Sequence, residues 1–174
     1  MTQAAVRDFL MGNVRVPTLK ALTAKLQRKM HRFKHAKQST FFVGERYSRH
    51  AKALVSHIQD NDKELADTKL LALVEKVGVY YTTVVCLFNE AEYILTKVLD
   101  VRTKQHGRKT SDDAGCLWEL ARALDKQSRY SESLNRYGES LAMFQRLRDH
   151  RNVAALLSSI GSVLRGQGKY SEAL

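Results

Sequence analysis

The feature that most limits how this chain can fold is a six-residue segment that recurs, nearly unchanged, 40 residues later. It reads Arg-Tyr-Ser-Glu-Ser-Leu at 129–134 and Lys-Tyr-Ser-Glu-Ala-Leu at 169–174. The apolar positions before it align at the same offset: Leu117 with Leu157, Leu120 with Ile160 and Leu124 with Leu164. A looser third copy, over 78–99, lies 42 residues upstream of the first. Such a period indicates an array of stacked structural units.

Each unit has the pattern of two antiparallel helices. Apolar residues follow a 3–4 spacing in two stripes: Leu117, Leu120 and Leu124, then Tyr130, Leu134, Tyr137, Leu141 and Phe144. The segment between the stripes, Lys126–Arg129, has room only for a tight turn. Small residues at Ala121/Gly161 and Ser133/Ala173 are expected to let the two helices approach closely.

The periodicity predicts helices at 64–86, 89–104, 112–127, 131–147 and 151–167, with a last one starting near Tyr170. Asp112 and Asp113 follow a polar loop over 104–113 and are suitable helix starters. We group the chain into a basic segment, 1–60, and repeats over 61–174 (64–104, 112–147 and an incomplete 151–174). A helix that stops at Leu174 has about one turn, so we expect a fragment of a longer array.

The charge of +11 belongs almost wholly to the N-terminal segment. Residues 1–52 contain twelve Lys or Arg against two acids, whereas 53–174 contain seventeen against sixteen. Residues 18–37 form a basic amphipathic pattern, with Leu19, Leu22, Leu26, Met30 and Phe33 on its apolar face. A second helix is expected at about 45–59, and we interpret the two as a degenerate first hairpin.

Four roles for residues 18–37 stay open. They are a solvated helix that caps the array, a mitochondrial presequence, an anchor for acidic membrane surfaces and a calmodulin-like target. Nucleic-acid binding is disfavoured because few aromatic residues interleave with the basic ones.

Nothing in the sequence predicts catalysis, a metal or a cofactor. His31 and His35 share a helix face, but no carboxylate or cysteine accompanies them and Arg32 would repel a cation. The nucleotide-binding, nucleophile-elbow and zinc-protease motifs are absent. Cys86 and Cys116 lack metal-ligand spacing. We interpret them as buried or semi-buried free thiols of an intracellular protein. We expect a cytoplasmic location, with a mitochondrial one as the alternative.

The residues Ile160-Gly161, Gly168, Tyr170 and Glu172-Ala173-Leu174 resemble the tetratricopeptide repeat pattern. Over 90–121 the chain is also similar to the long-repeat subgroup of kinesin light chains and nephrocystin-3-like proteins, with Glu90-Ala91-Glu92, Leu99 to Arg102, Gly107 and Asp113-Ala114. Gly107 is followed by an atypical loop, and the next repeat returns to 40 residues. The resemblance covers about 70–174 and implies an all-α fold, a right-handed α-solenoid of antiparallel helical hairpins.

The resemblance also implies a function. In such proteins partner peptides bind a concave groove lined by the first helix of each hairpin. Carried onto this chain, the groove residues are Lys76, Tyr80, Thr83, Trp118, Arg122, Asp125, Lys126, Ser158, Ser162 and Arg165. Arg122 and Arg165 could hold carboxylates of an acidic partner, while Trp118 either contacts the partner or packs between hairpins. We therefore predict a non-catalytic scaffold or adaptor. The alternative is an organelle-targeted or membrane-associated assembly factor that acts through its basic N-terminus.

Overall fold

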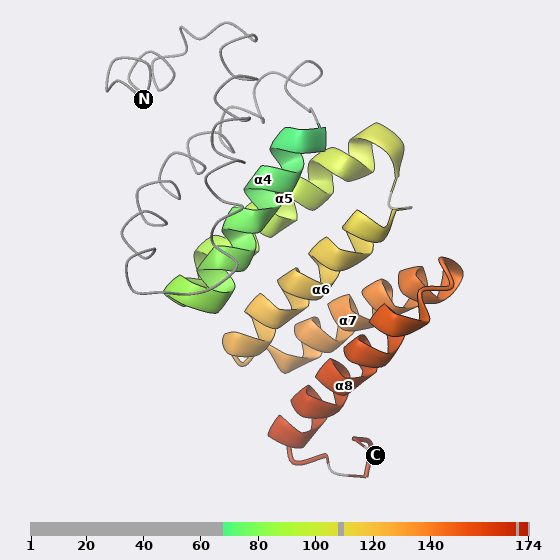
Figure 1. Cartoon of the computed structure of the whole chain (residues 1–174). Coiled ribbons are helices and arrows are strands. Elements are labelled where there is room, and N and C mark those ends of the chain that lie inside the picture. Colours follow the sequence, from blue (N-terminus) through green and yellow to red (C-terminus); the bar gives the residue numbers. More distant parts are fainter. Residues whose placement is uncertain (1–67, 108–109, 170, 174) are drawn as a thin grey trace, which may run out of the picture. The chain divides into compact units, whose positions relative to one another are not determined.

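A computed structural model describes residues 68–107, 110–169 and 171–173, and over these ranges every regular element is a helix (Figure 1). The chain divides into two compact units, Met1–Tyr80 and Tyr81–Leu174, and each is considered by itself. The helices predicted at 18–37 and 45–59 lie outside the described residues. An all-helical fold is what the periodicity predicts.

In the first unit the described element is α4, Thr68–Tyr80, which buries Leu71, Val74 and Val77 at a spacing of three. The predicted helix over 64–86 was wrong in its extent. The α-helix ends at Tyr80, and the second unit opens with a π-helical turn, η2, Tyr81–Val85. This turn contains Thr82, Thr83, Val84 and Val85, β-branched residues whose stiff side chains crowd an α-helix.

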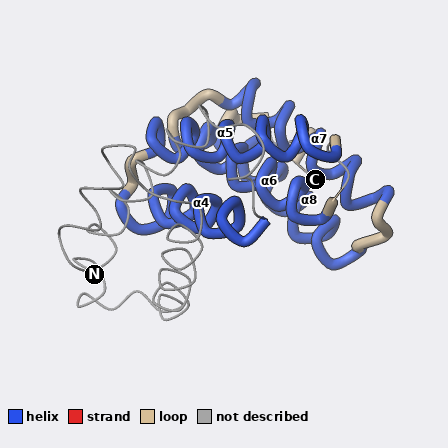
Figure 2. Tube along the Cα trace, turned by 90° about the horizontal axis from the view of Figure 1, so that it is seen from above, coloured by secondary structure: helices blue, strands red, loops and turns tan. Residues whose placement is uncertain are grey.

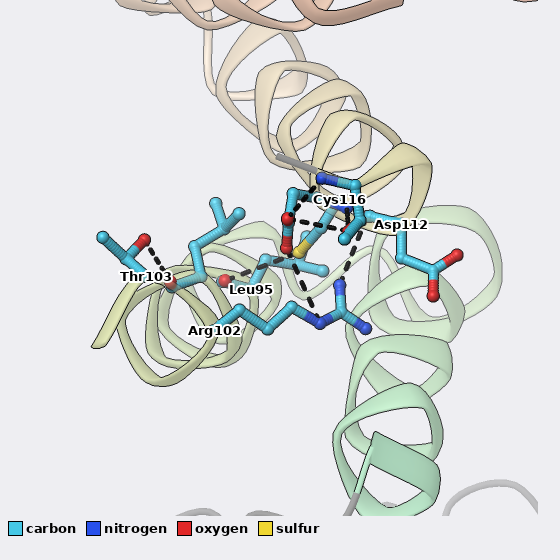
Figure 3. Close-up of polar contacts among 8 residues, drawn as sticks. Leu95, Arg102, Thr103, Asp112 and Cys116 are labelled. Atoms are coloured by element: carbon cyan, nitrogen blue, oxygen red, sulfur yellow. Dashed lines mark hydrogen bonds and ion pairs between the residues drawn. The ribbon is translucent and has the colours of Figure 1, made fainter. Parts of the chain in front are cut away.

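The break after η2 also corrects one cysteine. Cys86 has a backbone φ of 59° and an exposed side chain, between η2 and the next helix, so the expectation that it is buried or semi-buried was wrong. Cys116 is buried as expected, with its Sγ 3.7 Å from the carbonyl oxygen of Leu95 (Figure 3).

The second unit continues with α5 (Phe88–His106), α6 (Ser111–Lys126), α7 (Tyr130–Arg146) and α8 (His150–Gly166). Each begins one residue before its predicted start. Within this unit each helix packs on the next, and Figure 2 shows α5 and α7 in one layer with α6 and α8 in the other.

The same turn ends α6, α7 and α8. A residue in the left-handed region stands in each, Ser128, Arg148 and Gly168, with φ of 61°, 57° and 75°. The following amide donates to a carbonyl five residues back: Arg129 to Leu124 at 3.0 Å, Asp149 to Phe144 at 3.0 Å and Lys169 to Leu164 at 2.9 Å. This is the Schellman arrangement, which satisfies the last carbonyls of a helix and redirects the chain. The tight turn predicted after α6 is confirmed.

Two buried serines hold α6 and α7 close together. The Ser133 Oγ donates to the Ala121 carbonyl at 2.8 Å, and the Ser140 Oγ donates to that of Ala114 at 2.7 Å. Because the partner number falls by seven while the serine number rises by seven, the two helices run antiparallel. The close approach predicted at Ala121 and Ser133 is confirmed. Larger side chains in either serine position would separate the helices.

The apolar stripes surround this contact. Leu117, Leu120 and Leu124 of α6 are buried as predicted, and so are Tyr137 and Phe144 of α7. The other three residues of the predicted α7 stripe, Tyr130, Leu134 and Leu141, are half-buried.

The connection from α5 to α6 is closed by a buried carboxylate. Thr110 is the N-cap of α6: its Oγ1 accepts from the Asp113 amide at 3.2 Å, while its own amide donates to Asp113 Oδ2 at 3.0 Å. Arg102 reaches across from α5, with its Nε 3.9 Å from Asp113 Oδ1 and its Nη1 donating to the Asp112 carbonyl at 3.2 Å (Figure 3). The expectation that Asp112 or Asp113 starts the helix was therefore wrong. Both lie in its first turn, and the threonine completes a capping box with Asp113.

The first residue of the α8 stripe is exposed, whereas Ile160 is half-buried and Leu164 is buried. Leu157 is 51% exposed, whereas Leu117, its counterpart in α6, is fully buried against neighbouring helices. After α8 the described residues 171–173 form a turn, and the predicted helix start, Tyr170, lies outside the described residues. The turn returns along α8, because a Cβ added to Gly161 would lie 3.3 Å from the Ala173 carbonyl oxygen. This close approach involves the small-residue pair predicted from the repeat.

Candidate functional site

The ten predicted groove residues fall on four elements. Lys76 and Tyr80 belong to α4, where the lysine is exposed and the tyrosine is buried. Thr83 is exposed on η2. The other seven lie on α6 (Trp118, Arg122, Asp125 and Lys126) and on α8 (Ser158, Ser162 and Arg165). These seven residues are called the α6/α8 face below.

Trp118 packs against the second helix of its own pair. Its ring meets Phe144 of α7 edge to face, with centroids 6.4 Å apart and an interplanar angle of 83°. The indole is half-buried, and its Nε1 is inaccessible and has no hydrogen-bond partner among the described residues. Of the two roles that the sequence left open, this contact favours packing. Trp118 packs against α7 of the same helical pair, whereas the sequence interpretation placed it between neighbouring hairpins.

Arg122 already holds a carboxylate of its own helix. Its Nη1 lies 2.9 and 3.0 Å from the two carboxylate oxygens of Glu119, one turn earlier. Burial raises the pKa of the Glu119 carboxyl, and the adjacent Arg122 charge opposes this rise. A partner carboxylate would therefore have to share Arg122 with Glu119 or displace Glu119. The sequence-based prediction did not include this competition.

Asp125 and Lys126 close the α6 part of the face. Asp125 is half-buried and Lys126 is exposed. Burial, with the nearby negative charge of Asp125 as the next cause, raises the pKa of Tyr137 on α7 above its usual value. Tyr137 is thus a neutral, buried hydroxyl beneath this part of the face.

The α8 part is polar and exposed throughout. Ser158, Ser162 and Arg165 follow a 4–3 spacing, which puts them on one side of the helix. The Ser162 Oγ donates to the Ser158 carbonyl at 3.0 Å and accepts from Arg165 Nη2 at 3.0 Å. None of the three contributes to the core, so nothing in the packing requires these residue types.

A polar cluster at the α6–α7 turn was not predicted from the sequence. Arg129 bonds Glu132 and Glu92 at 2.6 Å each, and Gln127 donates to Glu92 at 3.0 Å. The hydrogen bonds to Glu132 and Glu92 raise the pKa of Arg129 above its usual value. Glu92 ties α5 to this turn. Arg129 and Glu132 are three residues apart and could have been paired from sequence, but Glu92 is 37 residues away.

The described residues offer no metal site and no bilayer-spanning helix. Across them no three His, Cys, Asp or Glu side chains gather as ligands would, and no helix is both long and apolar enough to span a membrane. His31 and His35 lie outside this part of the chain. The chemistry of the α6/α8 face is that of hydrogen-bond donors, acceptors and charges arranged along two helices.

One known family matches part of the chain. The family described as tetratricopeptide repeat matches residues 113–174, which cover α6 from its first turn, α7 and α8. A search of curated proteins finds no match. Tetratricopeptide repeats generally mediate protein–protein interaction, and the match covers the whole α6/α8 face.

Proposed function

With tetratricopeptide repeats over residues 113–174 as the premise, we propose that this chain is a non-catalytic scaffold that binds a protein partner along the α6/α8 face. The observation that carries the proposal is the exposed polar side of α8, Ser158, Ser162 and Arg165, whose side chains the fold does not use. Lys126 extends the same chemistry onto α6, the other helix of that layer.

The form of the partner follows from these side chains. The short serine side chains leave room for an extended peptide backbone to approach α8. Arg165 and Lys126 supply cations for carboxylates, and charge-assisted hydrogen bonds are the stronger kind. Arg122 joins them only if the partner competes with Glu119. We propose that the face is part of the concave groove of a right-handed α-solenoid of antiparallel hairpins. The likeness to the kinesin light chain subgroup and the cytoplasmic location belong to the same proposal.

A charge reversal on this face tests the proposal. In the Lys126→Glu, Arg165→Glu variant, the amount of partner protein captured from cells is expected to fall about tenfold, because two attractions become repulsions. The matched control is Lys97→Glu, Lys104→Glu on α5, in the other layer, which changes the net charge equally. Quantitative mass spectrometry of the captured proteins compares the two variants. Equal losses in both variants, or no loss in the first, would contradict the proposal.

The basic N-terminus can be separated from this function. Residues 18–37 lie outside the described part of the chain, and their role at a membrane, in calmodulin-like binding or in mitochondrial import stays a prediction. Deletion of residues 1–40 is expected to leave partner capture intact if the α6/α8 face carries it. Loss of both localisation and capture would favour the alternative, an assembly factor that acts through the N-terminus.

A further inference from the structure

The arginines of the described residues divide into two groups. Four of the eight pair with carboxylates of the chain: Arg102 with Asp113, Arg122 with Glu119, Arg129 with Glu92 and Glu132, and Arg136 with Glu139. Arg165 donates to Ser162. The remaining three, Arg146, Arg148 and Arg151, have neither ion pair nor hydrogen bond to a side chain or carbonyl within the described ranges, and all lie around the α7–α8 turn. These three residues are called the basic turn below.

The three arginines lie within six consecutive residues around one turn. Arg146 is the last residue of α7, Arg148 is in the left-handed position of the turn and Arg151 is in the first turn of α8. All three side chains are exposed. The one acid among them, Asp149, is occupied as N-cap: it accepts from the Asn152 amide at 3.1 Å and from Asn152 Nδ2 at 2.7 Å.

The middle arginine stands where glycine would be easier to accommodate. Arg148 has a φ of 57°, and the equivalent position in the next turn is Gly168, at 75°. A non-glycine residue in this region carries a conformational penalty. Ser128, the equivalent residue in the turn after α6, has a φ of 61°, so this backbone conformation belongs to the shared turn. What distinguishes Arg148 is a guanidinium that makes no ion pair or hydrogen bond within the described residues.

We propose that the basic turn binds a short acidic segment, a run of Asp or Glu side chains, on a partner protein. Guanidinium groups bind carboxylates in a two-pronged geometry, and three of them here have that capacity unused. Arg151 lies seven residues before Ser158, on the same side of α8, so the segment would continue the peptide proposed for the α6/α8 face. The inference rests on the proposed function only in requiring that the partner be a protein.

The surrounding charges favour a short peptide over a membrane or a nucleic acid. The described residues of the second unit contain twelve Lys or Arg and eleven Asp or Glu. Without the three arginines of the basic turn, nine Lys or Arg remain against eleven Asp or Glu, so the net charge is negative. Over the second unit as a whole, an extended polyanion would therefore meet no excess of positive charge beyond the turn. A segment of a few carboxylates contacts the turn alone.

Octaglutamate peptide is the probe, and the backbone amide NMR signals of residues 146–152 in the 174-residue chain are the readout. These signals report binding at the turn even if the basic N-terminus also attracts the peptide. In wild-type protein they are expected to shift saturably. In the Arg146→Gln, Arg148→Gln, Arg151→Gln variant the apparent Kd at the turn is expected to rise about tenfold, because three modest ion pairs with the peptide are lost. The matched control, Lys25→Gln, Arg28→Gln, Lys29→Gln, removes the same charge and should change this Kd less than about twofold.

A single variant separates binding from stability. Arg148→Gly removes the central charge and the left-handed strain together, so its melting temperature should rise while octaglutamate binding weakens about threefold. The proposal is overturned if the turn signals do not shift, or if the N-terminal control weakens binding as much as the turn variant. It is also overturned if phosphatidylserine vesicles engage these signals while octaglutamate does not, because the turn would then be a membrane contact.

Discussion

Replacing Asp113 with alanine is expected to lower the free energy of unfolding by about 2–4 kcal/mol, from the loss of a helix cap and of the carboxylate beside a buried arginine. The Asp113 side chain is fully buried and accepts from both the amide and the hydroxyl of Thr110. Arg102 is only 5% exposed, so its charge would lose a neighbouring anion without gaining water. Urea unfolding followed by circular dichroism measures the change.

Two further variants identify the cause. Asp113→Asn keeps an oxygen that can accept from Thr110 and should be less destabilising than Asp113→Ala. The Arg102→Met, Asp113→Ala double variant should lose less than the sum of the two single changes, because the stranded charge is gone. If Asp113→Ala costs under about 1 kcal/mol, or if the two changes are strictly additive, the capping box and the buried pair do not hold α5 to α6 as described.

The second large effect is expected at the α6–α7 contact. Replacing Ser140 with leucine should lower the free energy of unfolding by about 3 kcal/mol, because three carbons must fit where one fully buried hydroxyl oxygen contacts the α6 backbone. Ser140→Ala removes only the hydrogen bond to Ala114 and should cost about 1 kcal/mol. Thermal and urea unfolding of both variants give the comparison.

The matched control is Ser131→Leu on the same helix. Ser131 is exposed, so the same substitution there should change stability by less than about 0.5 kcal/mol. Similar effects for Ser140→Leu and Ser140→Ala would mean that the helices have room to spare, contrary to the short distance between them.

The sequence predicts local features of this fold better than distant ones. The boundaries of α6, α7 and α8 follow from apolar spacing, and the turn after α6 follows from the few residues between stripes. The predicted single helix over 64–86 failed because hydrophobic spacing continues through the β-branched run of η2, where the backbone changes its hydrogen-bonding pattern. Thr110 was overlooked as N-cap because Asp112 and Asp113 are also good cap residues.

On the candidate surface, too, local features were easier to predict than contacts between distant residues. The exposed side of α8 is visible in the repeat, since its residues lie off the buried stripe. Arg122 and Glu119 are three residues apart, so their pairing could have been predicted from the sequence. Whether an arginine forms an ion pair within the chain, however, depends on side-chain geometry. The roles of Trp118 and Glu92 depend on Phe144 and Arg129, which are 26 and 37 residues away. No periodicity encodes such contacts.

The α6/α8 face, and α8 in particular, is proposed to contact a protein partner. Site-specific photocrosslinking of the 174-residue chain, with benzoylphenylalanine placed at Ser158 or Ser162 of α8, detects such a contact at a chosen position. Asn135 of α7, exposed in the other layer, is the matched control position. One crosslinked protein band is expected from each α8 position and none from Asn135. Crosslinks from Asn135 alone, or equally from all three positions, would contradict it.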